Sequence, residues 1–278
     1  MRLDGKAVRP VSRYFGQFNV VLFCPEDLLI PRGSPGSRRR FLDRAVFNRQ
    51  PGHLVAVRDY EKTIKSRNSL LKDALATGRR DETLLSVYDE QVAAFGARII
   101  DSRLRLMAEI KPMFCRAFES ITQTGLTVDV LYDSQLPDLS LGTELEQIQE
   151  KLTAALAEAR PVDFRRATTS VGPHRDDIEF RLAERSASAF ASQGQLRALV
   201  LAWKTSELEL LEKVHGEAPI LLLDDVSSEL DETRNQYLFE FLRHRHNQCF
   251  ITTTHPKHVL LTSNRRDFEV DSGRIEPR

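Results

Sequence analysis

Three short groups of polar residues in the last third of the chain have the types and the order needed to hold a nucleotide. The first is the run Ser192-Gln193-Gly194-Gln195, which begins a helical pattern. The second is an apolar stretch that ends in Asp224-Asp225 and is followed by Ser228-Glu229-Leu230-Asp231. The third is a strand-like stretch that ends at His255. They predict an anion-binding helix start, two acids at one strand end and an imidazole at the next.

The start of the helical run suits an anion. A serine and a glycine at this place present free backbone N–H groups and the positive end of the helix dipole. Gly194 also lets the backbone approach a ligand closely. A serine that only caps the helix would explain the same residues, and seen alone this simpler interpretation is favoured.

The two acids follow a buried strand, where ligands gather in open α/β sheets. There Asp224 would hold a magnesium ion, usually through water. Asp225 would position the water that attacks a γ-phosphate or accept its proton, and His255 would reach the same phosphate. Each residue alone has an ordinary structural explanation, so the functional interpretation rests on the order and spacing of all three groups.

The phosphate-binding loop of such a site is not in the sequence. The pattern G-x-x-x-x-G-K-S/T is approached only at Gly5-Lys6 and in the Gly33 to Gly36 turn, and neither has the required glycine spacing. Without the amides and the lysine of that loop, we expect Asp224 and Asp225 to hold little of an Mg-ATP.

Composition indicates a folded protein of one large or two modest domains, with 278 residues and 41% hydrophobic content. No run approaches the ~18 apolar residues of a membrane span, so we expect no membrane association and a cytoplasmic location. Cys24, Cys115 and Cys249 are odd in number and lack C-x-x-C spacing, which indicates neither a disulfide framework nor a zinc site.

Charge is strongly uneven along the chain, although the net charge is zero. Residues 32–80 include thirteen basic and four acidic residues, a net charge of about +9. Residues 207–232 are almost entirely acidic among their charges. The basic segment is expected to meet a polyanion and the acidic one a metal or a basic partner, while a solvated helical face explains the basic run equally well.

Hydrophobic periodicity predicts an α/β protein with an inserted helical lobe. We expect β-structure in the first 23 residues, including a strand at 18–23, then helices at 38–47, 51–76 and 81–120. The predicted elements after these are strands at 126–132, 168–172, 178–182, 220–224, 248–253 and 268–270, and helices at 141–159, 195–214 and 231–244. Apolar strands that alternate with helices predict a mostly parallel sheet covered on both faces.

At the level of whole motifs the chain resembles the RecF family, which are ABC-type ATPase heads related to SMC proteins. The resemblance covers nearly all of the chain. The segments that carry it are Val20 to Leu28, Gly33 to Pro35 with Arg38 to Asp43, Arg67 to Lys72, Gly172 to Asp177, Ser192 to Gln195, Leu222 to Asp231 and Thr252 to Pro256.

The resemblance implies a domain division and a role for each group. Residues 1–25 would be part of ATPase lobe I, 26–125 a helical lobe II, and 126–278 the remainder of the ATPase lobe. Ser192 to Gln195 would be the ABC signature, Asp224 and Asp225 the Walker B pair, Ser228 to Asp231 the D-loop and His255 the switch histidine. In such heads two protomers pack face to face, and the signature of one closes over ATP held by the other.

The departure from the family pattern lies at the amino end. Complete members carry a further segment there with the phosphate loop, and we expect this chain to begin after it, while its carboxyl end looks complete. The strand at 220–224 is then expected to lack a central-sheet neighbour and to expose backbone groups and apolar surface.

The resemblance implies a RecF-like recombination mediator in DNA replication, repair and the SOS response. Such a protein would bind single-stranded DNA, single-strand/double-strand junctions, ATP and Mg²⁺ through a head-to-head homodimer, with RecO and RecR as partners. Arg38, Arg39 and Arg40 are the candidates for contacts with DNA phosphates. Two alternatives remain: a non-catalytic DNA- or partner-binding fragment that cannot hydrolyse ATP, and a truncated or mis-started reading of an intact gene. The intact site residues favour the second of these.

Overall fold

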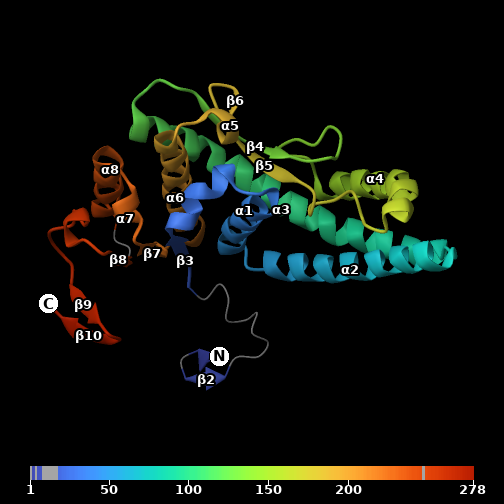
Figure 1. The fold of residues 1–278 in the computed structure, drawn as a ribbon, viewed down its shortest axis with the longest axis horizontal. Helices are drawn as coiled ribbons and strands as arrows, with labels where there is room; N and C mark the ends of the chain where they lie inside the picture. The colour runs from blue at the N-terminus through green and yellow to red at the C-terminus, as the bar shows by residue number, and fades with distance from the viewer. Residues whose placement is uncertain (1, 4, 8–17, 246–247) are drawn as a thin grey trace.

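A computed structural model describes residues 2–3, 5–7, 18–245 and 248–278. Most of the β-structure expected before residue 18 therefore lies outside the described residues. Figure 1 shows a small parallel sheet at one end of the molecule and an elongated group of helices at the other. Short elements outside these two parts are β1 (Arg2–Leu3), β2 (Lys6–Ala7), η2 (Pro25–Arg32), α5 (Ala187–Phe190), α7 (Val226–Glu229), α8 (Glu232–Arg243) and η3 (Pro256–His258).

The parallel sheet has the strand order β3-β7-β8, with β3 at Val20–Phe23, β7 at Ile220–Asp224 and β8 at Cys249–Thr252. The central strand β7 pairs with β3 from Val20↔Ile220 onward and with β8 up to Asp224↔Thr252. The expectation that this strand lacks a neighbour is therefore wrong. A partner about two hundred residues away in the sequence fills the place, and local periodicity carries no signal for such a pairing.

Only one face of this sheet is covered by the described residues. On that face Val21, Phe23, Leu221 and Leu223 are buried beneath α6 (Gln193–His215). On the other face Leu22 is 36% exposed and Phe250 is 54% exposed, on either side of Leu222. The predicted cover on both faces is thus wrong for the described chain, and the expected exposure of apolar surface is confirmed. Apolar strand sequences alone do not say whether both faces are covered.

A second sheet is antiparallel and separate from the first. It consists of β4 (Val128–Asp133), β5 (Asp177–Leu182) and β6 (Arg185–Ser186). The predicted strands at 126–132 and 178–182 are confirmed, but they do not extend one mostly parallel sheet. Near the carboxyl end β9 (Phe268–Asp271) pairs with β10 (Arg274–Pro277), so the strand predicted at 268–270 has a partner that was not predicted.

The helical lobe is formed by α1 (Pro35–Arg49), α2 (His53–Thr77), α3 (Glu82–Thr122) and α4 (Leu145–Arg166). Ser34 caps α1 by accepting a hydrogen bond from the N–H of Ser37, and Asp81 caps α3 through the N–H of Leu84. The long α3 contributes Phe114 to the core beside the parallel sheet and Val92 to the core between α2 and α4. One continuous helix therefore connects the two ends of the molecule (Figure 1).

Helix α4 continues through Pro161 to Arg166, seven residues beyond its predicted end. The last turn buries Asp163 and Phe164 against the rest of the lobe. These tertiary contacts outweigh the local preference of proline to interrupt a helix. None of the helices in the described part is long and apolar enough to cross a membrane.

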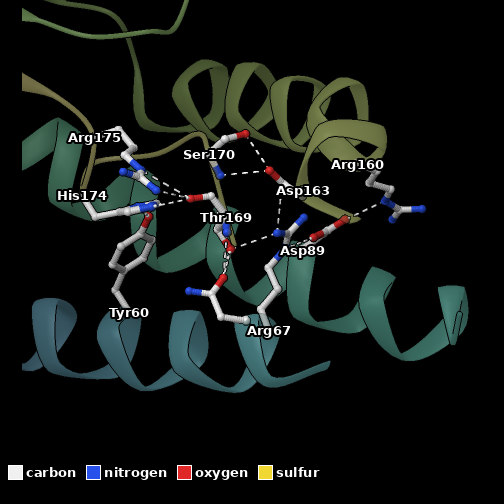
Figure 2. A network of polar contacts seen from close by, with 10 residues as sticks. Tyr60, Arg67, Asp89, Arg160, Asp163, Thr169, Ser170, His174 and Arg175 are labelled. Atoms are coloured by element: carbon white, nitrogen blue, oxygen red, sulfur yellow. Dashed lines mark hydrogen bonds and ion pairs between the residues drawn. The ribbon is translucent and has the colours of Figure 1, made fainter. Parts of the chain in front are cut away.

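A buried polar network closes the helical lobe (Figure 2). The guanidinium of Arg67, which is 0% exposed, donates hydrogen bonds to Asp89 at 2.6 Å, Asp163 at 2.7 Å and the hydroxyl of Thr169 at 2.9 Å. Asp163 also accepts from the backbone N–H and the hydroxyl of Ser170. The segment 168–172 is therefore a loop held by side chains, and the strand predicted there is wrong. Its β-branched residues are typical of strands, but its polar groups are bound by this network.

The turn from Gly172 to Asp177 is anchored to α2 through a histidine. Nδ1 of His174 accepts a 2.6 Å hydrogen bond from the hydroxyl of Tyr60, and its Nε2–H donates to the carbonyl of Thr169 at 3.1 Å. Burial lowers the pKa of His174 to about 4, so the imidazole is neutral at physiological pH. The turn is thereby fixed between α2 and β5.

Candidate functional site

The run Ser192 to Gln195 forms the start of α6 with a complete capping box. The hydroxyl of Ser192 accepts from the N–H of Gln195 at 3.2 Å, and the side-chain oxygen of Gln195 accepts from the N–H of Ser192 at 2.8 Å. The N–H groups of Gln193 and Gly194 belong to the first turn, where helix geometry provides no acceptor. Ser192 and Gln193 are exposed. The structural cap is therefore present, and two N–H groups of the first turn are available for an anion.

Arg32 holds the chain that leads into this helix. Its Nε donates to the carbonyl of Ser188 at 3.2 Å and its Nη2 to the carbonyl of Ala191 at 2.5 Å. Because η2 follows β3 directly, this contact ties the end of a sheet strand to the start of α6. Sequence analysis missed Arg32, since its partners lie more than 150 residues away.

The segment from Ser228 to Asp231 lies beside the start of α6. Asp231 caps α8 by accepting from the N–H of Arg234, and its carboxylate pairs with the guanidinium of the same residue. That guanidinium lies against Gly194, where an added Cβ would be 3.3 Å from Nη2. A second contact joins Arg197 of α6 to Glu229 at 3.0 Å.

Two cations therefore stand close to the exposed helix start. Burial and the nearby charge of Arg197 lower the pKa of Arg234. Each guanidinium also pairs with a carboxylate, Arg197 with Glu229 and Arg234 with Asp231, so two ion pairs lie beside the helix start. Neither arginine was recognised in the sequence, although both lie within a few residues of the predicted motifs.

The acidic pair is positioned by one residue of the neighbouring strand. The hydroxyl of Thr252 donates to the carboxylate of Asp224 at 2.6 Å. The N–H of Asp225 donates to both the carbonyl and the hydroxyl of Thr252 at 3.1 Å. Asp225 has a φ of 50°, in the left-handed region, and begins α7. Asp224 is exposed and Asp225 is half-buried, so both carboxylates are accessible.

His255 follows β8 on the same edge of the sheet as the acids. Its backbone N–H donates to the hydroxyl of Thr253, and its exposed ring lies 5.8 Å from the ring of His258. The N–H of Thr254 lies 3.5 Å from a carboxylate oxygen of Asp225, the outer limit of a hydrogen bond. The loop of His255 and the acidic pair are therefore neighbours, with the imidazole turned towards solvent.

The side chains at the two places can be compared with what magnesium and phosphate require as ligands. Within the described residues no three His, Cys, Asp or Glu side chains are grouped as a metal site. Magnesium, however, keeps several waters and takes only one or two carboxylates together with phosphate oxygens. The exposed carboxylate of Asp224 suits that role, and the start of α6 suits a phosphate.

The three arginines predicted to contact DNA have different surroundings. Arg38 forms a two-point ion pair with Asp177, in which Nε lies 2.8 Å from Oδ1. Arg39 donates to the carbonyl of Asp176 at 2.8 Å, and burial together with Arg103 lowers its pKa. Arg40 is exposed at the rim of a cavity of about 470 Å³ next to η2. Of the three, Arg40 is the one whose guanidinium makes neither an ion pair nor a hydrogen bond with the residues that the structure describes, since Arg39 is held by a backbone carbonyl.

Comparison with known proteins connects this chain to one group of relatives. No protein-family model matches the sequence. The DNA replication and repair protein RecF of Geotalea uraniireducens is 41% identical over 281 residues, which cover 99% of this chain and 74% of that protein. The protein of the same name from Myxococcus xanthus is 46% identical over 256 residues, which cover 91% of this chain and 66% of that protein.

Two solved structures give the same result for the fold. Both are of the recombination mediator protein RecF in the RecFOR pathway, and one of them is RecF with ATP. They superpose with TM-scores of 0.88 and 0.87 at 32% and 31% identity, and cover 99% and 100% of this chain and 72% of each of those chains. The superpositions confirm the predicted α/β fold of an ABC-type ATPase head with an inserted helical lobe.

Proposed function

This chain belongs to the RecF family of DNA replication and repair proteins, and from that premise we propose that it acts as a recombination mediator on single-strand/double-strand DNA junctions. The chain spans 74% and 66% of the length of these two relatives. The activity and partners of a whole RecF protein are therefore part of the proposal. They include association with mediators of the RecO and RecR type, and the division into lobes at residues 25 and 125.

The observation that carries the proposal is the exposed start of α6 with its capping box. The free N–H groups of Gln193 and Gly194, the hydroxyl of Ser192 and the nearby guanidiniums of Arg197 and Arg234 together suit a phosphate group. Because the 278 residues hold no phosphate loop, this helix start would act on ATP bound by a second protomer. The two protomers would then form a head-to-head dimer.

The acidic edge of the sheet would serve the other half of such a site. Asp224 would hold Mg²⁺ through its exposed carboxylate, and Asp225 would position water or accept its proton. Asp231 would lie at the dimer interface, and His255 would turn towards the γ-phosphate. The magnesium ion, when bound, would neutralise charge on the phosphates. The hydrogen bonds between Thr252 and the two acids support this assignment because they fix the carboxylate of Asp224 and the backbone of Asp225.

DNA contact is the part of the proposal that can be tested on this chain alone. Among the three arginines, Arg40 is the best placed to contact DNA, because Arg38 and Arg39 are bound to the turn before β5. Binding of a gapped duplex would be measured by fluorescence anisotropy over a range of salt concentrations. We expect affinity to fall linearly with salt on logarithmic axes, and Arg40→Gln to reduce the slope by about 0.9, the value for one phosphate contact. Arg166→Gln, an exposed position on α4, is the matched control. Absence of any DNA binding at low salt would refute the proposal.

A second candidate function follows from the missing phosphate loop. In that case the chain binds DNA or a mediator partner without turning over nucleotide. Measurement of ATP hydrolysis separates the two candidates. Added intact RecF supplies a phosphate loop. Hydrolysis above that of the intact RecF alone, lost on Ser192→Ala in this chain, supports the catalytic candidate, and no added hydrolysis supports the non-catalytic one.

A further inference from the structure

One face of α2 carries a line of positive charge. Arg58, Lys62, Lys65 and Lys72 are spaced by four, three and seven residues, which places them on the same side of a helix. All four are exposed. From the first to the last the line extends about 21 Å along the helix axis.

The packing of α2 fixes the direction of this face. The opposite side of the helix is buried against α3 and α4 by Tyr60, Thr63, Arg67, Leu71 and Ala74. The centre of the buried side lies half a turn from the centre of the basic line, so the basic face points away from the lobe. In Figure 1 α2 forms the outer edge of the helical lobe, with α3 and α4 on its other side.

Three of these four charges are unpaired among the described residues, in contrast to other basic residues of the same segment. Lys62, Lys65 and Lys72 form no ion pair with the residues that the structure describes. Arg58 contacts only its neighbour Asp59, at 3.2 Å, and its side chain is 71% exposed. By comparison, Arg44 is paired with Asp27 and Arg49 with Glu109. Arg67 is paired with the buried Asp89. The acids Glu61 and Asp73 of α2 lie on the two flanks of the basic line and not within it.

The face has charge but no surface on which a base could stack. The ring-bearing residues of α2, His53 and Tyr60, are both buried. Binding of single strands relies on exposed aromatic side chains as stacking platforms. A straight, rigid line of lysines without aromatic residues instead complements the regular phosphates of a duplex.

We propose that the basic face of α2 binds the phosphate backbone of duplex DNA without sequence preference. The inference rests on the proposed DNA role of the chain, and it adds a second contact surface on the helical lobe, separate from Arg40. It also accounts for much of the basic charge in residues 32–80 that is not used in internal ion pairs.

The test compares three variants of the whole chain on a blunt duplex without gaps. The first variant combines Lys62→Gln, Lys65→Gln and Lys72→Gln, which keep the helix propensity and the length of the side chains. The control combines Arg165→Gln, Arg166→Gln and Lys213→Gln, which remove three exposed charges from α4 and α6. The third variant replaces the same three lysines of α2 by arginine.

We expect the α2 variant to lower the salt slope by about 2.7, since each phosphate contact contributes about 0.9. Over a fourfold rise in salt, the unaltered chain would then lose about 40-fold more affinity than the variant. The control and the arginine variant should retain the original slope. Thermal unfolding is expected to be the same for all variants, because the altered positions are exposed.

Other outcomes overturn the inference in distinguishable ways. If the unaltered chain binds no duplex, the proposed DNA role itself fails. If it binds and the α2 variant keeps both slope and affinity, only the α2 surface is refuted. If polyglutamate displaces the duplex at equal charge concentration, the face is a general site for acidic chains, and the DNA assignment is wrong.

Discussion

The hydroxyl of Thr252 donates a 2.6 Å hydrogen bond to the carboxylate of Asp224 across the pair of parallel strands β7 and β8. The same threonine accepts the N–H of Asp225 through its carbonyl and its hydroxyl. One residue of β8 therefore orients both acids at the edge of the sheet. A metal ion at Asp224 would find one carboxylate oxygen already held by the protein.

The change Thr252→Val should show this coupling, because it keeps the shape of the side chain and removes the hydroxyl. We expect a loss of about 1 kcal/mol in the free energy of unfolding, the usual contribution of one hydrogen bond. The measurement is urea denaturation followed by circular dichroism. Thr254→Val is the control, with little expected change, and equal losses in both variants would contradict the assignment.

Arg32 should determine how firmly the start of α6 is held. The change Arg32→Gln removes the hydrogen bonds of a charged group to the carbonyls of Ser188 and Ala191, which are worth about 1.5 kcal/mol or more. We expect amide hydrogen exchange in 188–196 to become about tenfold faster. Exchange in 205–215, at the other end of α6, should not change. Arg40→Gln is the control, and unaltered exchange at 188–196 would show that Arg32 does not position this segment.

The buried network in the helical lobe should depend on Arg67 (Figure 2). The change Arg67→Met leaves the buried carboxylate of Asp163 without its cation, and such losses cost about 3–5 kcal/mol. The exposed Arg58→Met should cost less than about 0.5 kcal/mol. Denaturant unfolding measures both. A similar small loss for the two variants would mean that the network contributes little to stability.

Stability should fall in mild acid because of His174. Burial holds its pKa at about 4 in the folded chain, against about 6.5 in an unfolded one. The folded state therefore prefers the neutral ring, and its contribution is complete above pH 6.5 and is lost as pH falls towards 4. Between pH 7 and pH 5 we expect a loss of about 2 kcal/mol.

Urea unfolding at the two pH values measures this loss. In His174→Gln the loss should be smaller by about the same amount. A pH dependence that survives His174→Gln in full would assign the effect to another group.

Sequence patterns were sufficient for the elements that carry the site. The apolar run before Asp224 coincides with β7, and the helical period after Ser192 coincides with α6, because both elements are encoded by adjacent residues. The same holds for the caps at Ser34 and Asp81. Placing the acids and His255 on one edge of a sheet needed only the rule that parallel strands end together.

Contacts between distant segments were not accessible in this way. The pairing of β3 with β7, the contact of Arg32 with Ser188 and the network around Arg67 all join residues far apart in the chain. The loop at 168–172 was mistaken for a strand because its β-branched residues were visible and their buried partners were not. The pairing of Arg38 with Asp177 is another such contact, since it cannot be inferred from a run of arginines.

The most direct test of the central claim is nucleotide-dependent assembly through the start of α6. The chain would be mixed with the RecF protein of the ATP-bound structure and examined by sedimentation velocity with ATP, with ADP and without nucleotide. We predict a mixed dimer that forms only with ATP and is weakened by Ser192→Ala. Ser34→Ala removes an equivalent helix cap on α1 and should leave the dimer intact. Absence of an ATP-dependent dimer, or equal weakening by both changes, would contradict the claim that Ser192 to Gln195 acts on a nucleotide.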